Sequence, residues 1–315
     1  MRDSFAREMT ALAEQRTDVT LLSGDIGNRM FDRYKEVAPE RFFNCGIAEA
    51  NMMSLAAGMA LSGLRPVIYT ITPFTTTRCL EQIRVGVAYH QAPVVIVGTG
   101  SGLSYAELGP THHSLEDMAI LRTLPGLNVL APADSAELVA QLREALDAPN
   151  PTYMRIGKKG EPPLHGAAAQ LGIGKANLLR EGRDLLVVGV GPILDEALQA
   201  AEAVAAEGCS VAVASLGGVK PLDAAFLEAM AQRFHHWLSL EEHGITGGLG
   251  SALLEWLAER DGPPIRLKRL GVPDVFLHEL GNQSYTRRQL GLDARGLACT
   301  YASQYSQEIH SSEWT

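Results

Sequence analysis

The sequence of 315 residues is poor in cysteine and lacks long apolar runs. Its four cysteines (Cys45, Cys79, Cys209 and Cys299) stand far apart without a Cys-x-x-Cys pair, a pattern that fits neither a disulfide framework nor a zinc site. No apolar stretch approaches the ~20 residues that a membrane-spanning helix needs, and the first residues lack the apolar core of a signal peptide. We therefore expect a cytoplasmic protein without a membrane partner.

A run of basic residues is also missing. Lys plus Arg number 27 against 36 for Asp plus Glu, which gives a formal charge of −9. Clustered Lys and Arg neutralise the phosphates of DNA and RNA, so this balance argues against a nucleic-acid partner. The composition, 46% hydrophobic and 20% charged, excludes a disordered chain, and the length suggests about two domains.

Short apolar runs alternate with Ala- and Leu-rich stretches of helical spacing. The expected strands are residues 19–23, 41–44, 66–70, 93–98, 127–131 and 152–156, then 184–189, 210–215, 236–240 and 265–270. The expected helices begin with one containing Phe5, Met9 and Leu12 and continue at 48–61, 78–89, 114–121, 135–146, 193–206, 223–231 and 247–259. This alternation predicts βαβ units and mostly parallel sheets that are covered on both faces.

The segment 157–166 is rich in glycine, proline and charge, as linkers often are. We therefore predict an α/β protein of two doubly wound domains, residues 1–160 and 176–315, joined by a linker over residues 161–175.

Three segments of the first half combine polar residues with a turn before a helix. In the first, a glycine turn precedes Glu49, which opens an apolar helix; an acid there also simply favours the helix dipole, and spacing alone points to that bland role. In the second, His112 and His113 follow a Gly-Pro turn, where loops after strands bind ligands, although surface histidines fit equally well. In the third, Thr72–Arg84, threonines could cap a helix and Phe74 could pack in the core or offer a flat face.

Together these segments resemble the transketolase family. The family's Gly-x-x-Glu is Gly46-Ile-Ala-Glu49, its Thr-Arg-x-x-Glu-Gln-Ile-Arg is Thr77 to Arg84, and its Gly-Pro-Thr-His region runs from Gly109 to Pro125. Its third domain is matched by Lys220-Pro-Leu-Asp223, by Glu241 to Ser251, and by Gly271-Val-Pro-Asp274 with Phe276. Motifs in family order along nearly the whole chain make the resemblance specific. It implies a pyrimidine-binding domain followed by a transketolase C-terminal domain.

The resemblance implies thiamine diphosphate as cofactor. Glu49 matches the carboxylate that hydrogen-bonds the ring nitrogen of its aminopyrimidine and acts there as an acid–base partner. Phe74 is the candidate platform for the pyrimidine, while the register leaves Thr72 and Thr75 open for the family's aromatic positions. Arg78 matches an arginine near the pyrimidine in some relatives.

His112 matches the family histidine that contacts the donor's hydroxyls and takes part in catalysis. The family aspartate before Gly-Pro-Thr-His is Leu108 here, and a family histidine twelve positions before His112 is Gly100. Because leucine cannot hydrogen-bond a sugar hydroxyl, a deoxy, modified or less hydroxylated donor is favoured. Arg29, Arg33 and Lys158 are the candidates for the family's phosphate-binding arginines.

Transketolases bind the diphosphate and Mg²⁺ on another domain with a Gly-Asp-Gly motif, which this sequence lacks. The resemblance therefore implies a split transketolase, with a partner subunit that supplies the metal ligands in an α2β2 heterotetramer. The expected reaction moves a two-carbon ketol unit from a ketose, a phosphate or a modified sugar, to an aldose. Alternatives are the beta subunit of a 2-oxo acid dehydrogenase, a deoxyxylulose phosphate synthase-like enzyme and, from another class, a non-catalytic regulatory subunit.

Overall fold

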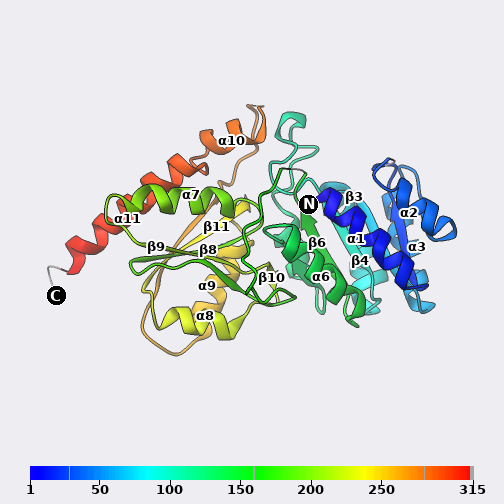
Figure 1. The fold of residues 1–315 in the computed structure, drawn as a ribbon, viewed down its shortest axis with the longest axis horizontal. Helices are drawn as coiled ribbons and strands as arrows, with labels where there is room; N and C mark the ends of the chain where they lie inside the picture. Colours follow the sequence, from blue (N-terminus) through cyan, green and yellow to red (C-terminus); the bar gives the residue numbers. More distant parts are fainter. Residues whose placement is uncertain (28, 159, 280, 313–315) are drawn as a thin grey trace.

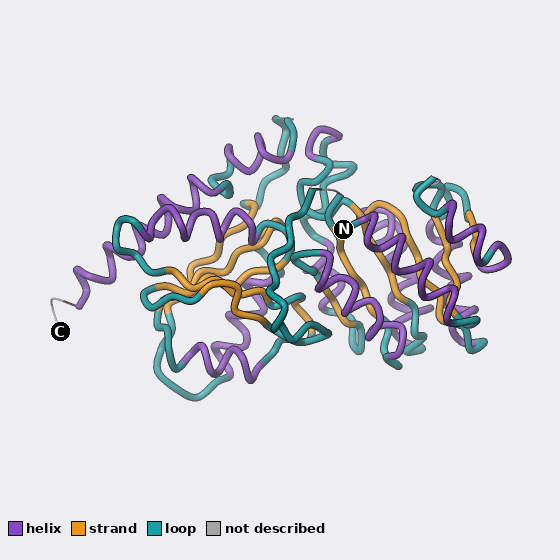
Figure 2. The backbone as a smooth tube through the Cα atoms, viewed as in Figure 1, coloured by secondary structure: helices purple, strands orange, loops and turns teal. Residues whose placement is uncertain are grey.

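The computed structural model describes residues 1–27, 29–158, 160–279 and 281–312, and it places two β-sheets side by side (Figure 1). Helices cover both faces of each sheet, so each half of the molecule has three layers (Figure 2). This is the mixed α/β architecture that the alternating sequence pattern predicts.

The first sheet has seven strands in the order β10-β5-β6-β4-β3-β1-β2. Pairing is parallel throughout except for β10 on β5. The strands are β1 (Val19–Ser23), β2 (Phe42–Asn44), β3 (Arg65–Ile71), β4 (Val95–Thr99), β5 (Asn128–Leu130), β6 (Thr152–Ile156) and β10 (Gly218–Lys220). Because the central strands are buried on both sides, their apolar runs are continuous rather than alternating.

Two layers of helices enclose this sheet. One face packs α1 (Arg2–Gln15), α2 (Asp32–Val37) and α6 (Ser135–Asp147) around an apolar core. The other face packs α3 (Glu49–Leu61), the π-helix η3 (Gln82–Tyr89) and α5 (Asp117–Arg122). Short helical turns complete the loops: η1 (Pro39–Arg41), α4 (Thr72–Thr75), η2 (Thr77–Cys79) and η4 (Ala106–Leu108).

The second sheet has the order β12-β11-β8-β9-β7. Its strands are β7 (Asn177–Arg180), β8 (Leu185–Val190), β9 (Val211–Ser215), β11 (His236–Gly244) and β12 (Arg266–Val272). Helices α7 (Leu194–Ala205) and α11 (Ala294–Ser312) lie on one face, and α8 (Ala224–Ala231) and α9 (Leu249–Glu259) on the other (Figure 1). Helix α10 (Gln283–Gln289) sits beside the junction of the two halves.

Strand β10 crosses from the second half of the chain into the first sheet. It pairs antiparallel with β5 through Gly218 opposite Leu130 and Lys220 opposite Val129. The core cluster beneath it joins apolar residues of both sheets into one continuous body. The two halves are therefore interlocked rather than merely adjacent.

Some local predictions were wrong. The single helix expected at 78–89 is a 3₁₀ turn followed by the π-helix η3, and the helix expected from Ser114 begins at Asp117 instead. Strands β7 and β10 and helices α2, α10 and α11 were not anticipated. Within the described part of the chain, no helix combines the length and apolarity that crossing a bilayer requires.

Candidate active site

The candidate residues gather at the carboxyl edge of the first sheet. Glu49 follows β2, Phe74 and Arg78 follow β3, His112 follows β4, and Lys158 follows β6. These strands are near neighbours in the order β6-β4-β3-β1-β2, so loops far apart in sequence meet along one edge. Open α/β sheets bind ligands at this edge.

Glu49 is held at the start of α3 by the turn before it. Gly46 has φ +68, and its amide donates to Oδ1 of Asn44 at 3.0 Å. Ala48 caps the helix, and Glu49 is its first residue, with a side chain only 5% exposed. Its Oε1 accepts a hydrogen bond from Nη1 of Arg78 at 3.2 Å. A carboxylate is thus buried at the edge with one half-exposed cation beside it.

The loop after β3 supplies two flat groups. The guanidinium carbon of Arg78 lies 4.1 Å from the centroid of the Phe74 ring, a cation–π arrangement. The ring of Phe74 also meets the imidazole of His112 edge to face, with 5.4 Å between centroids. Thr75 does not reach this surface, because its buried hydroxyl donates to the carbonyl of Thr72 at 3.0 Å.

The threonines of this loop do not cap a helix by accepting from amides. Thr76 donates its hydroxyl to Thr72 O at 2.8 Å, and Thr77 donates to Pro73 O at 3.0 Å. Such back-bonding closes the short α4 turn and fixes the direction in which Phe74 leaves it.

His112 sits in the turn that Gly109 (φ +75) opens, where its amide donates to Gly109 O. Its Nδ1 lies 2.9 Å from the hydroxyl of Thr111. Partial burial, with His113 and Arg78 nearby, lowers the pKa of His112 from its ordinary value. The lowered pKa favours the neutral form of the imidazole at pH 7. His113 is buried instead, with its Nε2 3.1 Å from Ala106 O.

Lys158 is connected to His112 through Tyr105, an aromatic residue that the sequence analysis did not identify. Its Nζ lies 4.3 Å from the ring centroid of Tyr105 and 3.1 Å from Oε1 of Glu107. The Tyr105 ring in turn meets His112 edge to face at 6.1 Å. Contacts thus run without a break along what we call the edge strip: Glu49, Arg78, Phe74, His112, Tyr105 and Lys158.

The remaining candidates lie elsewhere. Arg33 is exposed on α2, where it pairs with Glu36 at 2.9 Å and lies 4.0 Å from Glu14 of α1. Arg29 is exposed in the turn before α2. Leu108 ends η4 with 49% of its surface exposed, four residues before His112. Among the described residues, neither Arg29 nor Arg33 forms an ion pair with a member of the edge strip.

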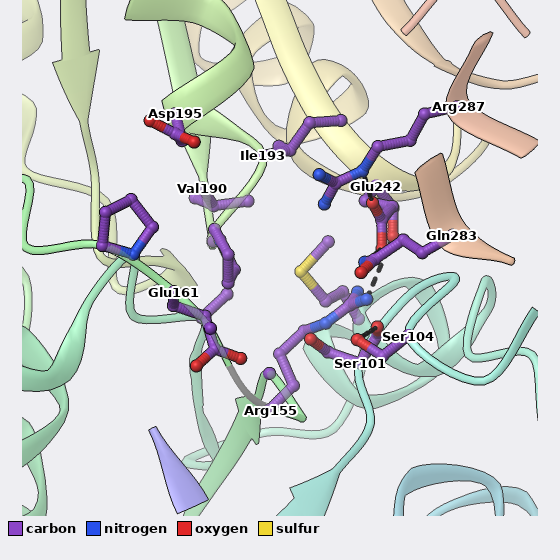
Figure 3. Close-up of a pocket in the computed structure, with 17 residues that line it drawn as sticks. Ser101, Ser104, Arg155, Glu161, Val190, Ile193, Asp195, Glu242, Gln283 and Arg287 are labelled. Atoms are coloured by element: carbon purple, nitrogen blue, oxygen red, sulfur yellow. Dashed lines mark hydrogen bonds and ion pairs between the residues drawn. The ribbon is translucent and has the colours of Figure 1, made fainter. Parts of the chain in front are cut away.

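Beside the loops that carry Tyr105 and Lys158, a polar cavity of about 100 Å³ is lined by residues of both halves (Figure 3). Arg155, only 5% exposed, donates to Oδ1 of Asp117 and to the carbonyls of Ser114 and Glu242. Glu242 accepts from Leu103 N at 2.7 Å and forms an ion pair with Arg287. The hydrogen bonds of Arg155 and of Leu103 to Glu242 thus tie the first half to the second.

This network corrects one expectation about the loop. The spacing of Ser114 and Asp117 suggests a weak capping box, but neither side chain caps α5. Asp117 instead accepts from the phenol of Tyr153 at 2.6 Å and pairs with Arg155. The hydroxyl of Ser114 is buried without a hydrogen-bond partner among the described residues.

A second buried group of charges holds the linker. The imidazole of His165 lies 3.1 Å from Oδ2 of Asp134 and 3.6 Å from Oε1 of Glu137, although neither contact has hydrogen-bond geometry. Burial raises the pKa of Glu137 to about 7, partly opposed by His165. Burial would lower the pKa of His165, but the two carboxylates outweigh it and raise that pKa. We call Asp134, Glu137 and His165 the linker cluster.

Comparison with known proteins places this arrangement in a family. Residues 1–161 match the model of the transketolase pyrimidine binding domain, and residues 174–296 match that of the transketolase C-terminal domain. An apulose-4-phosphate transketolase subunit of Phocaeicola vulgatus is 33% identical over 301 residues, which cover 95% of each chain. A "6-deoxy-6-sulfo-D-fructose transketolase subunit SqwH" of Clostridium sp. is 33% identical over 94% of this chain and 91% of that one.

Longer relatives match over part of their length. A "1-deoxy-D-xylulose-5-phosphate synthase 1" of Geobacter sulfurreducens is 37% identical, but the match covers 82% of this chain and 41% of that protein. A solved structure described as "Split gene transketolase, inactive beta4 tetramer" superposes with a TM-score of 0.86 at 31% identity and covers 97% of both chains. The chain belongs to the transketolase family.

Proposed function

We propose that this chain is the subunit of a split, thiamine-diphosphate-dependent transketolase that moves a two-carbon ketol unit from a ketose to an aldose. The observation that carries the proposal is the edge strip, in which a buried glutamate and a histidine flank stacked flat groups at the ligand-binding edge of the sheet. The end-to-end match with proteins named as transketolase subunits supports the same assignment.

The residues of the strip fit the pyrimidine half of the cofactor. Glu49 offers a buried carboxylate whose Oε1 is held by Arg78, and we assign its Oε2 to the ring nitrogen of the aminopyrimidine. Phe74 and Arg78 offer faces against which an aromatic ring packs. When bound, thiamine diphosphate supplies the carbon that attacks the ketose and carries the ketol unit. Glu49 holds and returns the proton at the ring nitrogen. Because its carboxylate is buried, it exchanges that proton with the cofactor rather than with water.

His112 and Lys158 fit the sugar. A neutral imidazole both donates and accepts, so His112 can hold a donor hydroxyl while the bond beside it breaks. Lys158 brings a positive point charge to the far end of the strip, where an anionic group of the substrate would bind. Leu108, exposed beside this loop, offers no hydrogen bond, so we propose a donor that lacks or modifies the hydroxyl read there.

We assign the diphosphate and Mg²⁺ to a partner subunit in a cytoplasmic α2β2 heterotetramer. Large apolar side chains exposed on the elements that follow Glu49 support such a partner, since apolar groups left in water favour burial in an interface. They lie in the loop before α3, on α3 and on η3: Ile47, Leu55, Leu61, Val85 and Tyr89. We propose domain boundaries at 1–160, 161–175 and 176–315, with β10 contributed across them.

One alternative rests on a specific observation. The deoxyxylulose phosphate synthase relative has the higher identity, 37% against 33%. Its match spans under half of that protein, however, whereas the match to the Phocaeicola vulgatus transketolase subunit is end to end. An activity assay distinguishes the two. Transfer of a ketol unit to an aldose would favour the split transketolase, and condensation of a 2-oxo acid with an aldehyde would favour the synthase.

The test is reconstitution. The chain is co-purified with the product of a neighbouring gene that encodes a Gly-Asp-Gly domain, and ketose donors are screened with thiamine diphosphate and Mg²⁺. We expect ketol transfer by the complex and a loss of at least about 100-fold in Glu49→Gln, because general acid–base groups contribute roughly 10²–10⁴-fold. Full activity of the isolated chain would refute the split assignment.

The chain offers a matched control for Glu49. Glu8 of α1 is also buried, with its side chain 9% exposed, and it also pairs with a half-exposed arginine, Arg143. Glu8→Gln therefore repeats the loss of a buried ion pair without touching the edge strip. Near-wild-type turnover in Glu49→Gln, or equal losses in both variants, would contradict the role of Glu49.

A further inference from the structure

The first residue beyond β4 leaves no room for a side chain. Gly100 has φ +78, a conformation that favours glycine. A Cβ atom on Gly100 would lie 2.0 Å from Cε2 and 2.3 Å from Cδ2 of the Tyr105 ring. The volume into which a side chain at position 100 would project is thus filled by the phenol of Tyr105.

The same ring contacts two groups that the proposed function uses. Lys158 places its ammonium over the ring at 4.3 Å from the centroid, and His112 meets the ring edge to face at 6.1 Å. The ring therefore lies between the imidazole of His112, which we assign to the hydroxyls near the transferred unit, and the ammonium of Lys158, which we assign to an anionic group at the other end of the substrate. Its size fixes how far apart the two groups stand.

The backbone around Tyr105 is held from behind by the second half of the molecule. Leu103 N donates to Glu242 Oε1 at 2.7 Å, and Ser104 donates its hydroxyl to Ser101 O at 2.7 Å. Figure 3 shows Ser101 and Ser104 beside Arg155 and Glu242, on the wall of the polar cavity. Tyr105 is thus carried by a loop whose backbone is hydrogen-bonded to the second half, which is the kind of support that a specificity-determining side chain requires.

We propose that Tyr105 determines the specificity of the donor site, selecting ketoses that end in an anionic group such as a phosphate or a sulfonate. This inference rests on the proposed function. The ring closes the space over Gly100 and orients Lys158 toward the substrate's anionic end while His112 meets the hydroxyls near the transferred unit. Glu107 does not block Lys158, since their pair is exposed to water and such pairs are weak.

The experiment compares two donors in the reconstituted complex with thiamine diphosphate, Mg²⁺ and one aldose acceptor. The donors are a ketopentose 5-phosphate and the same ketopentose without phosphate. We expect the wild type to prefer the phosphate. We expect Tyr105→Ala to reduce the ratio of the two kcat/KM values by about tenfold, mainly through KM of the phosphate, as lost positioning of one charged contact would.

Tyr105→Phe is the matched control. It keeps the ring, its packing on Gly100 and its face toward Lys158, so we expect the donor ratio to stay within about twofold of the wild type. In the double variant Tyr105→Ala/Lys158→Ala, the ratio should equal that of Lys158→Ala alone, because the ring acts through the ammonium. Tyr105→Leu, which fills the space but offers no aromatic face, replaces the alanine variant if that one does not fold.

The outcomes separate the two proposals. If the wild-type complex transfers ketol units neither from these donors nor from any deoxy or modified ketose in the reconstitution screen, the proposed function is wrong and the inference falls with it. If the wild type is active but shows no preference for the phosphate, or if Tyr105→Ala and Tyr105→Leu keep its donor ratio, the role of Tyr105 is wrong and the proposed function stands.

Discussion

The edge strip and the interdomain cavity are both rich in charge, yet they are built in opposite ways. In the strip, each charged group has one ion-pair partner, and the two cations keep contact with water; Arg78 is 47% exposed and Lys158 29%. In the cavity, Arg155 makes three hydrogen bonds while 5% exposed, and Glu242 is bound by Leu103, Gln283 and Arg287. Partly satisfied groups at a sheet edge can accept a ligand, whereas saturated groups hold the architecture that presents them.

The largest expected effect is a break in the saturated group. Arg155→Met leaves the carboxylate of Asp117 buried without its cation, which costs about 3–5 kcal/mol. For a protein of this size we expect the melting temperature to fall by roughly 10 °C, if the variant folds at all. Thermal unfolding followed by circular dichroism measures it.

Arg78→Met is the corresponding loss of an ion pair in the edge strip, for comparison with Arg155→Met in the cavity. Its partner Glu49 is buried, but Arg78 itself is half exposed, so we expect a stability loss of about 1 kcal/mol or less. Activity should fall much more, and the concentration of thiamine diphosphate required should rise. Equal melting temperatures for the Arg78 and Arg155 variants would remove the distinction between the two regions.

A smaller effect concerns the protonation of His112. Because the pKa of His112 lies below its ordinary value of about 6.5, we expect the acidic limb of kcat/KM to have its midpoint below that pH. In His112→Asn we expect a loss of about 10- to 100-fold and the disappearance of that acidic limb. The exposed His278 provides a control in His278→Asn, which should leave both rate and limb unchanged. An unaltered acidic limb in His112→Asn would assign it to another group.

The last prediction concerns how the stability of the fold changes with pH. The pKa of Glu137 is near 4.5 in the unfolded chain and about 7 in the folded one, so the folded state keeps its proton longer and stability falls as pH rises between those values. His165 acts in the same direction, since its raised pKa gives stability that is lost as pH rises through the folded value. Glu137→Gln should flatten the change in melting temperature between pH 5 and 8, a difference on the order of 2 kcal/mol. An identical pH profile in the variant would show that Glu137 does not titrate in this range.

Periodicity predicted the buried strands because burial on both faces leaves an unmistakable apolar run, as at Val95–Thr99 and Leu185–Val190. It could not predict β10, since three residues containing glycine carry no period and pair with a strand far away in sequence. Motifs led to Glu49, Phe74, Arg78, His112 and Lys158, which the fold brings together. Their catalytic and binding roles stay predictions.

Other positions lay beyond what motifs can tell. Thr75 and Phe74 are neighbours in sequence, but the α4 turn buries one and presents the other. Tyr105 stands in an irregular loop and matches no motif; only its packing on Gly100 reveals it. The sequence did contain one indication of its role. Gly100 stands where the family has a histidine, and the absence of that side chain implies that another group fills the space.

The crossing of β10 has a consequence for anyone who recombines such proteins. Exchange of the second half at the linker would bring a foreign edge strand into the first sheet, next to β5. The Lys220 ammonium, which donates to the carbonyls of Arg122 and Leu124, would be exchanged as well. A chimera should therefore take β5, β10 and the turn after α5 from the same parent protein. We expect crossover points that separate these three segments to give chains that fold poorly, even when each half packs well.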